Sequence, residues 1–449
     1  MSDFRDRRLH MLGIGGAGMS GLATVAYAWG ADVSGCDRAA SSYSERLVRF
    51  GIPVAAGHDP DHLEPEMEVV VSTAVPLDLP ELEEARGRGL EILHRAELLA
   101  QMVAARRSIC VAGAHGKTTT SAMIAYAATR LGLDPTFLVG GEVPQLGGNA
   151  GPGGGDLLVA EADESDGSLA LLRPRVAVVL NIELDHHARF SSDAELHDLF
   201  AEWVAAVPAD GAVLLGDGVN LQGTTAPCLR FGFALGADWH VSGLELESDA
   251  SAFWLSTPDA TPVHVTLAVP GAHNAHNAAG AIAALHACGA DAADVAAALA
   301  GFAGAGRRFE RRGERAGVAV IDDYAHHPTE LEAAIATARA QHPRRLVVCF
   351  QPHLYSRTAA LAGRFGAALA QADEAVVTEI YAAREEPMAG VTAKLVVDAA
   401  SERRPGMPLA YSRSLEEAAD YLRGRLREGD LVLTVGAGDV RRVGDLLLA

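Results

Sequence analysis

Residues 108–120 read SICVAGAHGKTTT: a short apolar run, a glycine-rich turn and the start of a helical pattern. Glycine lets a chain wrap closely around a phosphate, and such a turn aims backbone N–H groups and a helix N-terminus at the anion. Lys117 can reach β and γ phosphate oxygens, and the Thr118 hydroxyl can ligate Mg²⁺. The common Walker A spacing would require glycine at Val111. The stretch therefore predicts a variant phosphate-binding loop, with an ordinary glycine-rich turn as the alternative.

The choice of basic residue supports the phosphate-binding interpretation. Of the 37 basic residues, two are lysine (Lys117 and Lys394) and the rest are arginine. A compact ammonium suits a phosphate clamp better than a planar guanidinium does. A chain that otherwise uses arginine thus has a lysine at the position where a phosphate loop needs one.

Strand and helix patterns alternate in three blocks, which predict α/β domains over residues 1–107, 108–306 and 307–449. Strands separated by helices of about ten residues or more indicate parallel sheets with right-handed crossovers. The last boundary falls in a glycine- and arginine-rich stretch near residue 306 that has no apolar periodicity. Short alternating segments over 228–270 predict an antiparallel β insert in the middle block.

Charge and cysteine usage exclude several classes of function. With 37 basic and 58 acidic residues, the formal net charge is −21, which argues against a broad nucleic-acid or anionic-membrane footprint. The five cysteines are far apart and form no CxxC pair, so neither a disulfide framework nor a zinc site is expected from their spacing. The N-terminal residues contain no signal-type apolar region. A soluble cytoplasmic protein is the expectation.

Acidic side chains follow two further predicted strands. Glu161 comes directly after the apolar run DLLVA, and Asp185 and His186 follow VVLN. Open parallel sheets bind ligands beyond the carboxyl ends of their strands. Because Mg²⁺ prefers one or two carboxylates plus phosphate oxygens, these residues are candidate partners of the phosphate loop. Taken alone, each cluster also fits a solvated loop.

The N-terminal block contains a second glycine-rich turn, GIGGAG over residues 13–18. It matches the GxGxxG pattern, and Asp37 follows at the end of the next predicted strand. The pattern suits the pyrophosphate of a dinucleotide, with the carboxylate on a ribose hydroxyl. It serves equally well the diphosphate of a nucleotide sugar, so both interpretations stay open.

Further polar clusters occur later in the chain. His273 and Asn277 lie four residues apart at a predicted helix start, where adenine contact and helix capping are alternatives. Arg307 and Arg308 stand at the predicted domain boundary and could clamp a triphosphate. The stretches DYAHHP (323–328) and QPHLYSR (351–357) each follow a strand. Paired histidines before a helix are commonly capping residues.

Nine of these segments together resemble a known family. GIGGAGMSGLA, GAHGKTTT, EADESD, NIELDHH, PGAHNAHNAAGA, GRRFE, DDYAHHPTE, FQPHLYSRT and GAGD occur in the order seen in bacterial Mur ligases. The resemblance implies three domains: a Rossmann-like N-terminal domain for the UDP end of the substrate, a central P-loop ATP-binding parallel-sheet domain, and a Rossmann-like C-terminal domain that closes over the amino acid.

The resemblance is greatest to the alanine-adding branch, which implies a reaction. L-alanine would be joined to the lactyl carboxylate of UDP-N-acetylmuramate through an acyl phosphate, with ATP and Mg²⁺, for peptidoglycan synthesis, cell wall biogenesis, cell shape and cell division. The implied partners are these small-molecule substrates, and the implied assembly is a monomer or homodimer. A ligase that adds recovered tripeptide to the same nucleotide is the near alternative.

The resemblance also assigns expected roles to residues. The UDP part would contact Gly13, Gly15, Gly16, Gly18, Asp37, Ser72 and Thr73. ATP would contact Gly113, Ala114, His115, Gly116, Lys117, Thr118, Thr119, His273, Asn277, Arg308 and Asp323. The metal ligands would be Thr118, Glu161 and His186, and Tyr324, His326 and Arg357 would surround the alanine. The implied catalytic set is Lys117, Glu161, His186, Arg308, Asp323 and His326, with Asp323 or His326 as the general base.

Four features depart from the pattern of the family. Ala114 stands where the phosphate loop usually has Thr or Ser, and little loss is expected because that loop acts through backbone N–H groups. Leu354 stands where arginine is common, and Ala188 replaces a common acid. Several sister ligases bridge their metals with a carbamoylated lysine, but no lysine lies between 117 and 394.

Two other classes of protein fit parts of the sequence. A nicotinamide oxidoreductase accounts for GxGxxG and leaves residues 108–449 unexplained. A nucleotide-hydrolysing switch protein accounts for the phosphate loop and needs no third α/β domain.

Overall fold

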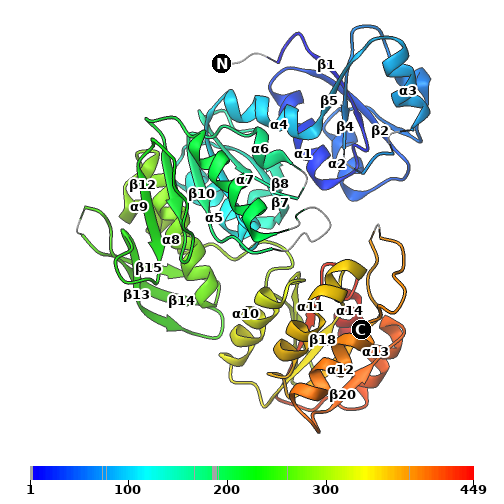
Figure 1. The fold of residues 1–449 in the computed structure, drawn as a ribbon, viewed down its shortest axis with the longest axis vertical. Coiled ribbons are helices and arrows are strands. Elements are labelled where there is room, and N and C mark those ends of the chain that lie inside the picture. The colour runs from blue at the N-terminus through cyan, green and yellow to red at the C-terminus, as the bar shows by residue number, and fades with distance from the viewer. Residues whose placement is uncertain are drawn as a thin grey trace.

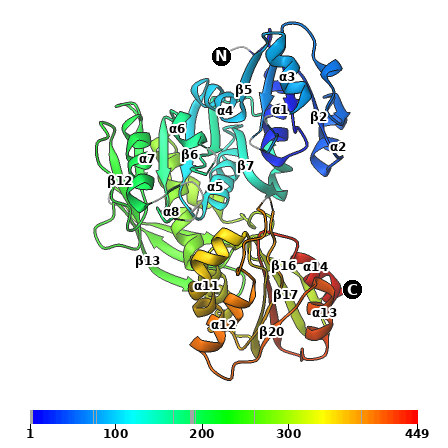
Figure 2. The ribbon, with the colours of Figure 1, turned by 45° about the vertical axis from the view of Figure 1, so that its right-hand side comes forward.

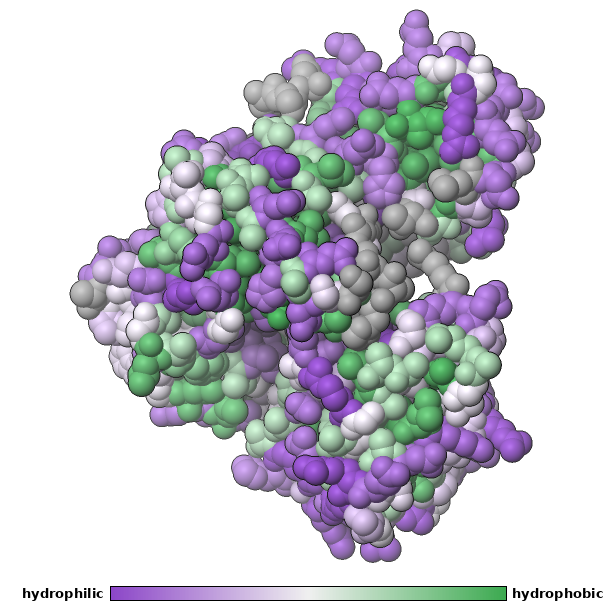
Figure 3. Space-filling model, viewed as in Figure 1, coloured by the Kyte–Doolittle hydropathy of each residue, from purple (hydrophilic) through white to green (hydrophobic). Residues whose placement is uncertain are grey.

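The computed structural model describes residues 4–449 except 73, 77, 166, 185–189, 191, 260 and 384, and the chain forms three α/β lobes (Figure 1). In both ribbon views the N-terminal lobe and the C-terminal lobe lie at opposite ends, with the central lobe joining them (Figures 1 and 2). A notch separates the two end lobes on the face shown in Figure 3, where hydrophilic residues predominate. In the described part of the chain, no helix has the length and apolar character needed to cross a membrane.

The N-terminal lobe contains a five-stranded sheet of order β3-β2-β1-β4-β5 in which every pair is parallel. This strand order confirms the predicted Rossmann-like arrangement. Its elements are β1 (Arg8–Leu12), α1 (Ala17–Ala28), β2 (Asp32–Asp37), α2 (Ser42–Arg49), β3 (Val54–Ala56), η1 (Pro60–His62), β4 (Glu68–Val71), α3 (Pro80–Gly87), β5 (Glu91–His94) and α4 (Arg95–Ala104).

The central lobe is built on a ten-stranded sheet of order β15-β14-β13-β12-β11-β10-β6-β9-β7-β8. Helices α5 and α8 pack against one another on one face of it. Its elements are β6 (Arg107–Ala112), α5 (Lys117–Arg130), β7 (Thr136–Val143), η2 (Pro144–Leu146), β8 (Gly148–Gly151), β9 (Leu157–Glu161), α6 (Ser168–Leu171), β10 (Val176–Val179), α7 (Asp193–Ala205), β11 (Ala212–Leu215), β12 (Cys228–Gly232), β13 (Trp239–Leu246), β14 (Ser251–Leu255), β15 (Val263–Leu267), α8 (Ala272–Ala287) and α9 (Ala292–Leu299).

The predicted β insert over 228–270 is partly wrong. Strands β13, β14 and β15 are antiparallel, as expected, but β12 pairs in parallel with both β11 and β13. The four strands therefore extend the central sheet. Alternation of polar and apolar residues indicates a half-buried strand, and it carries no information on the direction of its neighbour.

The C-terminal lobe has a six-stranded sheet of order β16-β17-β21-β18-β19-β20, in which only β16 is antiparallel to its neighbour. Strand β16 lies in the glycine- and arginine-rich stretch that has no apolar periodicity. An edge strand tolerates such charge because one side faces solvent. The elements are β16 (Glu310–Arg315), β17 (Val318–Asp323), α10 (Pro328–Arg339), β18 (Arg345–Phe350), α11 (Tyr355–Leu369), β19 (Glu374–Val377), α12 (Lys394–Arg403), β20 (Leu409–Tyr411), α13 (Leu415–Arg423), β21 (Asp430–Val435) and α14 (Arg441–Leu448).

Apolar packing is continuous between the first two lobes. One cluster of buried side chains includes residues of α1 and α4 together with residues of β6, β9 and α7 in the central lobe. Helix α1 packs on the β7–β8 hairpin, where Asn149 Nδ2 donates a 2.8 Å hydrogen bond to Ala17 O. The core of the C-terminal lobe forms separate clusters. The N-terminus of α1 is consequently held close to the central lobe.

Candidate functional site

The central glycine-rich turn runs from the end of β6 into the first residue of α5. Gly113 and Gly116 have φ angles of 139° and 85°, which favour glycine. A Cβ on Gly113 would lie 2.9 Å from Asn181 O, and one on Gly116 would lie 2.7 Å from Asn277 Oδ1. Both glycines are therefore required by backbone conformation and by close packing, which argues against an ordinary surface turn.

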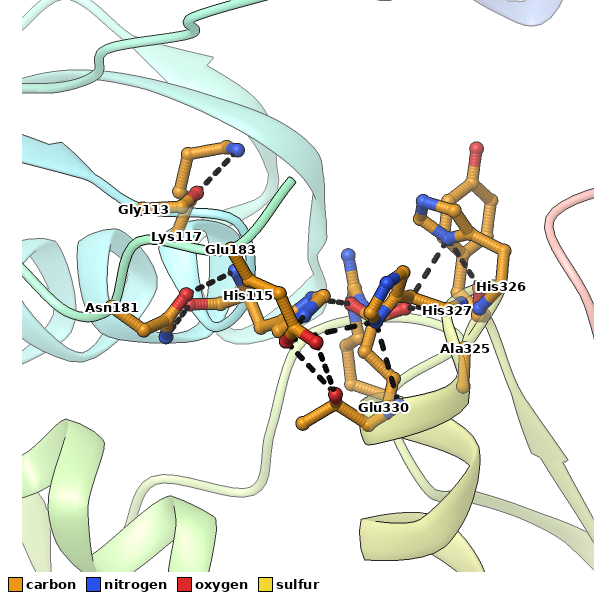
Figure 4. Close-up of polar contacts among 12 residues, drawn as sticks. Gly113, His115, Lys117, Asn181, Glu183, Ala325, His326, His327 and Glu330 are labelled. Atoms are coloured by element: carbon orange, nitrogen blue, oxygen red, sulfur yellow. Dashed lines mark hydrogen bonds and ion pairs between the residues drawn. The ribbon is translucent and has the colours of Figure 1, made fainter. Parts of the chain in front are cut away.

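Lys117 turns back over this loop. Its Nζ donates a 2.6 Å hydrogen bond to Gly113 O and lies 3.2 Å from Glu164 Oε2 (Figure 4). Burial alone would lower the pKa of Lys117, but the carboxylates of Glu164, Asp163 and Glu161 raise it above its ordinary value. The loop thus holds a permanent cation at its centre.

Asn181 fixes the shape of the loop. Its Oδ1 accepts from His115 N and its Nδ2 donates to His115 O, both at 2.9 Å (Figure 4). The residue follows β10, the strand beside β6, so the two strand ends meet at one sheet edge. Asn181 belongs to the NIELDHH segment, but nothing in the spacing of that segment indicated a role for its side chain.

Glu161 ends β9 at the same sheet edge, and its Oε1 accepts a 2.5 Å hydrogen bond from Gly140 N. Burial raises the pKa of this carboxyl, while Gly140, Lys117 and Thr118 oppose the shift. A half-buried carboxylate near a buried threonine offers hard oxygen ligands, which are the kind that Mg²⁺ prefers. The donor set at this position therefore fits magnesium.

A cavity of about 260 Å³ lies beside the loop. Gly116 and Thr119 line it from one side, His273 and Asn277 of α8 from another, and Arg308 from the C-terminal lobe. The lining also contains charged side chains, among them Arg308 and Asp323, next to the apolar Ala333 and Ala334. A cavity beside the phosphate loop with apolar walls and a few polar groups suits a purine base.

A second cavity, of about 600 Å³, is lined by all three lobes. The N-terminal lobe contributes Ala17, the central lobe contributes Thr118, and the C-terminal lobe contributes Arg308 and Tyr324. Thr118 of the central block and Arg308 and Tyr324 of the C-terminal block, all predicted site residues, therefore face one space, together with Ala17 of the N-terminal block.

His115 links the central lobe to the C-terminal lobe. Its Nε2 lies 3.0 Å from Glu183 Oε2 and its Nδ1 lies 3.3 Å from Glu330 Oε1 (Figure 4). Glu183 also accepts a 2.8 Å hydrogen bond from Thr329 Oγ1 and one of 2.9 Å from Arg364 Nη1. Burial would lower the pKa of His115, but the two glutamates raise it to about 9.

The DYAHHP segment has two distinct roles. Asp323 ends β17, and its carboxylate accepts from Phe309 N at 2.8 Å and from Ala325 N at 2.7 Å. Burial raises the pKa of Asp323 to about 6, against the lowering effect of Arg308. His327 is the N-cap of α10 and pairs with Glu330 in a capping box, so the capping interpretation holds for this histidine.

The two boundary arginines separate in role. Arg307 Nε lies 2.9 Å from Asp322 Oδ2, and its guanidinium also donates to the carbonyl oxygens of Gly436 and Gly438. Arg308 lines the 260 Å³ cavity beside the phosphate loop and lies 3.8 Å from Glu330 Oε1. The first arginine therefore anchors the chain, and the second faces the site.

Tyr324, His326 and Arg357 are connected by a series of side-chain contacts. The rings of Tyr324 and His326 are 5.5 Å apart, those of His326 and His353 are 5.9 Å apart, and Arg357 Nη1 lies 3.0 Å from His353 Nδ1. The structure thus brings the three residues together through His353. Leu354, which departs from the family pattern, has φ of 70° and precedes α11.

The N-terminal glycine turn lines a cavity of about 310 Å³ with Asp37, Arg38, Ser72 and Arg95. Gly15 N donates a 2.9 Å hydrogen bond to Asp37 Oδ2. A Cβ on Gly18 would lie 2.6 Å from Arg95 Nη1, so this guanidinium stands at the N-terminus of α1. Gly13, Gly16, Asp37 and Ser72 come together as predicted, and Arg95 is an addition that the motif did not indicate.

Several predicted residues lie outside the described part of the chain. Thr73, expected at the UDP site, and His186, expected as a metal ligand, belong to this group, as do Asp185 and Ala188.

Sequence reasoning missed Asn181, Glu183, Glu164, Arg95, His353 and Glu330. His353 and Arg357 are four residues apart, but Glu183 contacts Thr329 and Arg364, which lie 146 and 181 residues away. Only tertiary structure brings most of these groups together. For Glu330 a local signal was available, because a Glu three residues after the N-cap position indicates a capping box.

Comparison with known proteins gives matches over nearly the whole chain. Three family models match: "Mur ligase family, catalytic domain" over residues 8–107, "Mur ligase middle domain" over 111–285 and "Mur ligase, glutamate ligase domain" over 307–438. A UDP-N-acetylmuramate–L-alanine ligase of Acidothermus cellulolyticus is 44% identical, over 98% of this chain and 94% of that protein. One of Kineococcus radiotolerans is 45% identical, over 98% and 95%.

Solved structures agree with these matches. The UDP-N-acetylmuramate–alanine ligase of Thermotoga maritima superposes with a TM-score of 0.82 at 28% identity and covers 98% of both chains. A murein peptide ligase of Psychrobacter arcticus gives a TM-score of 0.72 at 25% identity, again over 98% of both chains.

Proposed function

This chain belongs to the Mur ligase family, and we propose that it is the ATP-dependent ligase that joins L-alanine to the lactyl carboxylate of UDP-N-acetylmuramate. The relatives that are 40–45% identical over nearly the full length bear that name. The structural observation that most strongly supports this proposal is the cavity beside the phosphate loop, which all three lobes line. A ligase of three substrates needs one space that each binding region can reach.

The reaction requires activation of a poor electrophile. An amine does not displace oxide from a carboxylate at neutral pH. The lactyl carboxylate therefore attacks the γ-phosphorus of ATP, the bond to ADP breaks, and an acyl phosphate forms. The neutral amine of alanine then attacks the acyl carbon, phosphate leaves with the C–O electron pair, and the amine loses a proton.

Two anions must meet in the first step, and side-chain cations offset their repulsion. Lys117 supplies a buried ammonium within the loop, and Arg308 enters the nucleotide cavity from the C-terminal lobe. Preorganised charges of this kind stabilise the phosphoryl-transfer transition state. His273 and Asn277 contact the adenine end, and Asp323 holds the loop that carries Arg308.

Thr118 and Glu161 are the described residues that would hold Mg²⁺, together with His186. When bound, the metal supplies Lewis-acid charge compensation for the phosphate oxygens. The Glu161 carboxylate is half-buried and already positioned by Gly140 N, so it needs little reorganisation.

The amino-acid end lies on the C-terminal lobe. Arg357, Tyr324 and His326 surround alanine, with the guanidinium on its carboxylate. His326 is the general base: its Nδ1 lies 3.1 Å from Tyr324 O, a contact in which Nδ1 carries the hydrogen, so that Nε2 has the lone pair. Asp323 is poorly suited, because both of its oxygens accept backbone hydrogen bonds.

The UDP part binds to the N-terminal lobe. Gly13, Gly16, Gly18 and the N-terminus of α1 receive the diphosphate, and Arg95 adds a cation. Gly15 contributes by holding Asp37 through its N–H group. Asp37, Ser72 and Thr73 contact hydroxyl and base groups. We propose domain bounds of 1–107, 108–306 and 307–449, and the change from one sheet to the next between β5 and β6 and between β15 and β16 supports them. One chain supplies every site residue, so a monomer suffices, and a homodimer would contain the site twice.

All five cysteines are free thiols, which fits a reducing cytoplasm as the place of reaction.

Phosphate release tests the function. Purified protein with ATP, Mg²⁺ and UDP-N-acetylmuramate is assayed without an amino acid and with L-alanine, L-serine, glycine or the recovered tripeptide. Release that depends on L-alanine supports the proposal. Release that depends on tripeptide identifies the recycling reaction instead, and release that needs neither acceptor nor muramyl nucleotide contradicts a ligase.

A further inference from the structure

A buried cluster of metal-type side chains lies in the N-terminal lobe, apart from the residues used above. His10 belongs to β1, Cys36 to β2, His62 to η1 and Glu81 to α3. One potential ligand atom of each lies within 4.8 Å of all the others. His10, Cys36 and Glu81 are buried, and the Glu81 side chain is 0% exposed.

The carboxylate of Glu81 is the centre of the cluster. Its Oε1 lies 3.0 Å from His10 Nε2 and 3.2 Å from His62 Nδ1, and its Oε2 lies 3.1 Å from Cys36 Sγ. His58 Nδ1 approaches the same Oε2 at 3.2 Å. The groups that contact Glu81 are thus imidazoles and a thiol, none of which carries a fixed positive charge.

A buried carboxylate of this kind is expensive without a cation. A divalent cation with one thiolate and one carboxylate would form a site with no net charge. The positions of the side chains therefore suit a metal better than they suit isolated neutral donors.

We propose that His10, Cys36, His62 and Glu81 bind one Zn²⁺ ion. Zinc takes four ligands drawn from thiolate, imidazole and carboxylate in a tetrahedral arrangement. A thiolate and two imidazoles are poor ligands for Mg²⁺, which separates this site from the one beside the phosphate loop. All four ligand atoms lie within 4.8 Å of one another, so small side-chain shifts would bring them onto one tetrahedral ion.

The surroundings of His10 fit the same role. Its second ring nitrogen, Nδ1, lies 2.9 Å from Ser34 Oγ. Ligating histidines commonly donate their other ring N–H to a neighbouring acceptor, which fixes the tautomer and leaves the lone pair for the metal. His62 is 23% exposed and gives the ion a path from solvent.

The site would hold together four segments that are distant in sequence. Cys36 directly precedes Asp37, and His58 lines the N-terminal cavity with Gly13 and Ser72. Zinc would therefore stabilise one wall of that cavity by fixing the end of β2 against η1 and α3.

Metal content tests the proposal on the full chain. The protein is treated with a chelator, loaded with Zn²⁺ in the presence of excess Mg²⁺, desalted and measured by elemental analysis. Parallel loading with Co²⁺ gives a thiolate-to-cobalt charge-transfer band when cysteine is a ligand. Cys36→Ser and His62→Gln remove one ligand each, and Cys228→Ser, which alters an exposed thiol of β12, is the matched control.

The expected result is one zinc ion per chain in the parent protein and in Cys228→Ser. Both ligand variants should lose zinc, and Cys36→Ser should also lose the cobalt band. A parent protein without zinc after loading overturns the proposal, as does zinc that is undiminished in His62→Gln. If Cys36→Ser does not fold by circular dichroism, His62→Gln decides alone, because its imidazole is partly exposed. These readouts are independent of ligase activity.

Discussion

Residues 13–18 and 113–118 occupy equivalent places in two sheets, offset by one hundred in number. Each segment follows the strand that ends at residue 12 or 112, and each leads into a helix that starts at residue 17 or 117. In both turns, side chains form hydrogen bonds with the backbone N and O of the third residue. Asp37 and Ser41 hold Gly15 N and O, while Asn181 alone holds His115 N and O.

The two turns differ in charge. The first helical residue is Ala17 in one and Lys117 in the other, and the clasp is an anionic carboxylate in one and a neutral amide in the other. The N-terminal turn receives its cation from Arg95 of α4, whereas the central turn carries its own. On the proposed assignment, closely similar backbones receive the diphosphate of a nucleotide sugar in one lobe and the more highly charged triphosphate of ATP in the other.

The largest effect is expected from removing Lys117, the cation that the central turn itself carries. Lys117→Ala should lower kcat by at least about 100-fold, because one preorganised charge on the transferring phosphoryl group is lost. Steady-state phosphate release measures this. Lys394→Ala is the matched control, since Lys394 lies over the Tyr411 ring in the C-terminal lobe. Near-normal turnover in Lys117→Ala would contradict the phosphate-loop assignment.

The second largest effect is expected from Arg95, the α4 residue whose guanidinium lies beside the N-terminal turn. Arg95→Ala should raise KM for UDP-N-acetylmuramate by about 10- to 100-fold with kcat little changed, because a charge-assisted contact of about 1.5–3 kcal/mol is lost. Initial rates at varied nucleotide concentration test this. Arg88→Ala, which breaks a surface pair with Glu84, should leave KM unchanged. A fall in kcat alone would count against a binding role.

A third prediction concerns the side chain that holds the backbone of each turn, Asp37 in the N-terminal turn and Asn181 in the central turn. Asn181→Asp gives the central turn the carboxylate that the N-terminal turn has, and it removes the donor to His115 O. KM for ATP should rise by about tenfold, since a negative charge then stands beside the phosphates. Asn220→Asp, at an exposed position, is the control. Equal KM values for ATP in both variants would show that the clasp charge has no influence.

His115 has no ionisable counterpart at Gly15, and this predicts a pH dependence. The pKa of His115 is raised from 6.5 to about 9, so its stabilising contribution is complete below pH 6.5 and is lost as the pH rises through about 9. The apparent Tm should therefore fall by a few degrees over that window. His115→Gln should flatten this part of the profile, and an unchanged slope in the variant would refute the assignment.

The smallest effect is expected at position 114. Ala114→Ser restores the residue type that is common in the family, and kcat should stay within about twofold because the loop acts through backbone N–H groups. Initial rates at saturating substrates measure this. A change of tenfold or more in either direction would mean that the side chain takes part.

Local sequence predicts the strands and turns of the site better than it predicts the partners of each side chain. Lys117, Gly116 and Thr118 are recognisable because one short segment contains the strand end, the turn and the helix start. Asn181 lies 66 residues from the His115 backbone that it clasps, and no periodicity connects them.

Some helices and strands have weak or misleading local signals in the sequence. Helix α3 begins with Pro80, which is a standard signal for a first helical turn, but the helix is short and weakly apolar. Strand β16 carries arginine because it is an edge strand, so its composition is that of a linker. The direction of β12 depends on the strand beside it, which composition cannot reveal.

The chain segment that enters the C-terminal lobe is bent at two non-glycine residues, Arg307 and Phe309, with φ of 58° and 51°. Such conformations cost about 1 kcal/mol or more each and persist when surrounding contacts fix them. Here the fixing contact for Phe309 is the Asp323 carboxylate itself. Asp323 and Phe309 both belong to the C-terminal lobe, so protonation of this carboxylate, whose pKa burial raises to about 6, would weaken the contact that holds the entry bend in place.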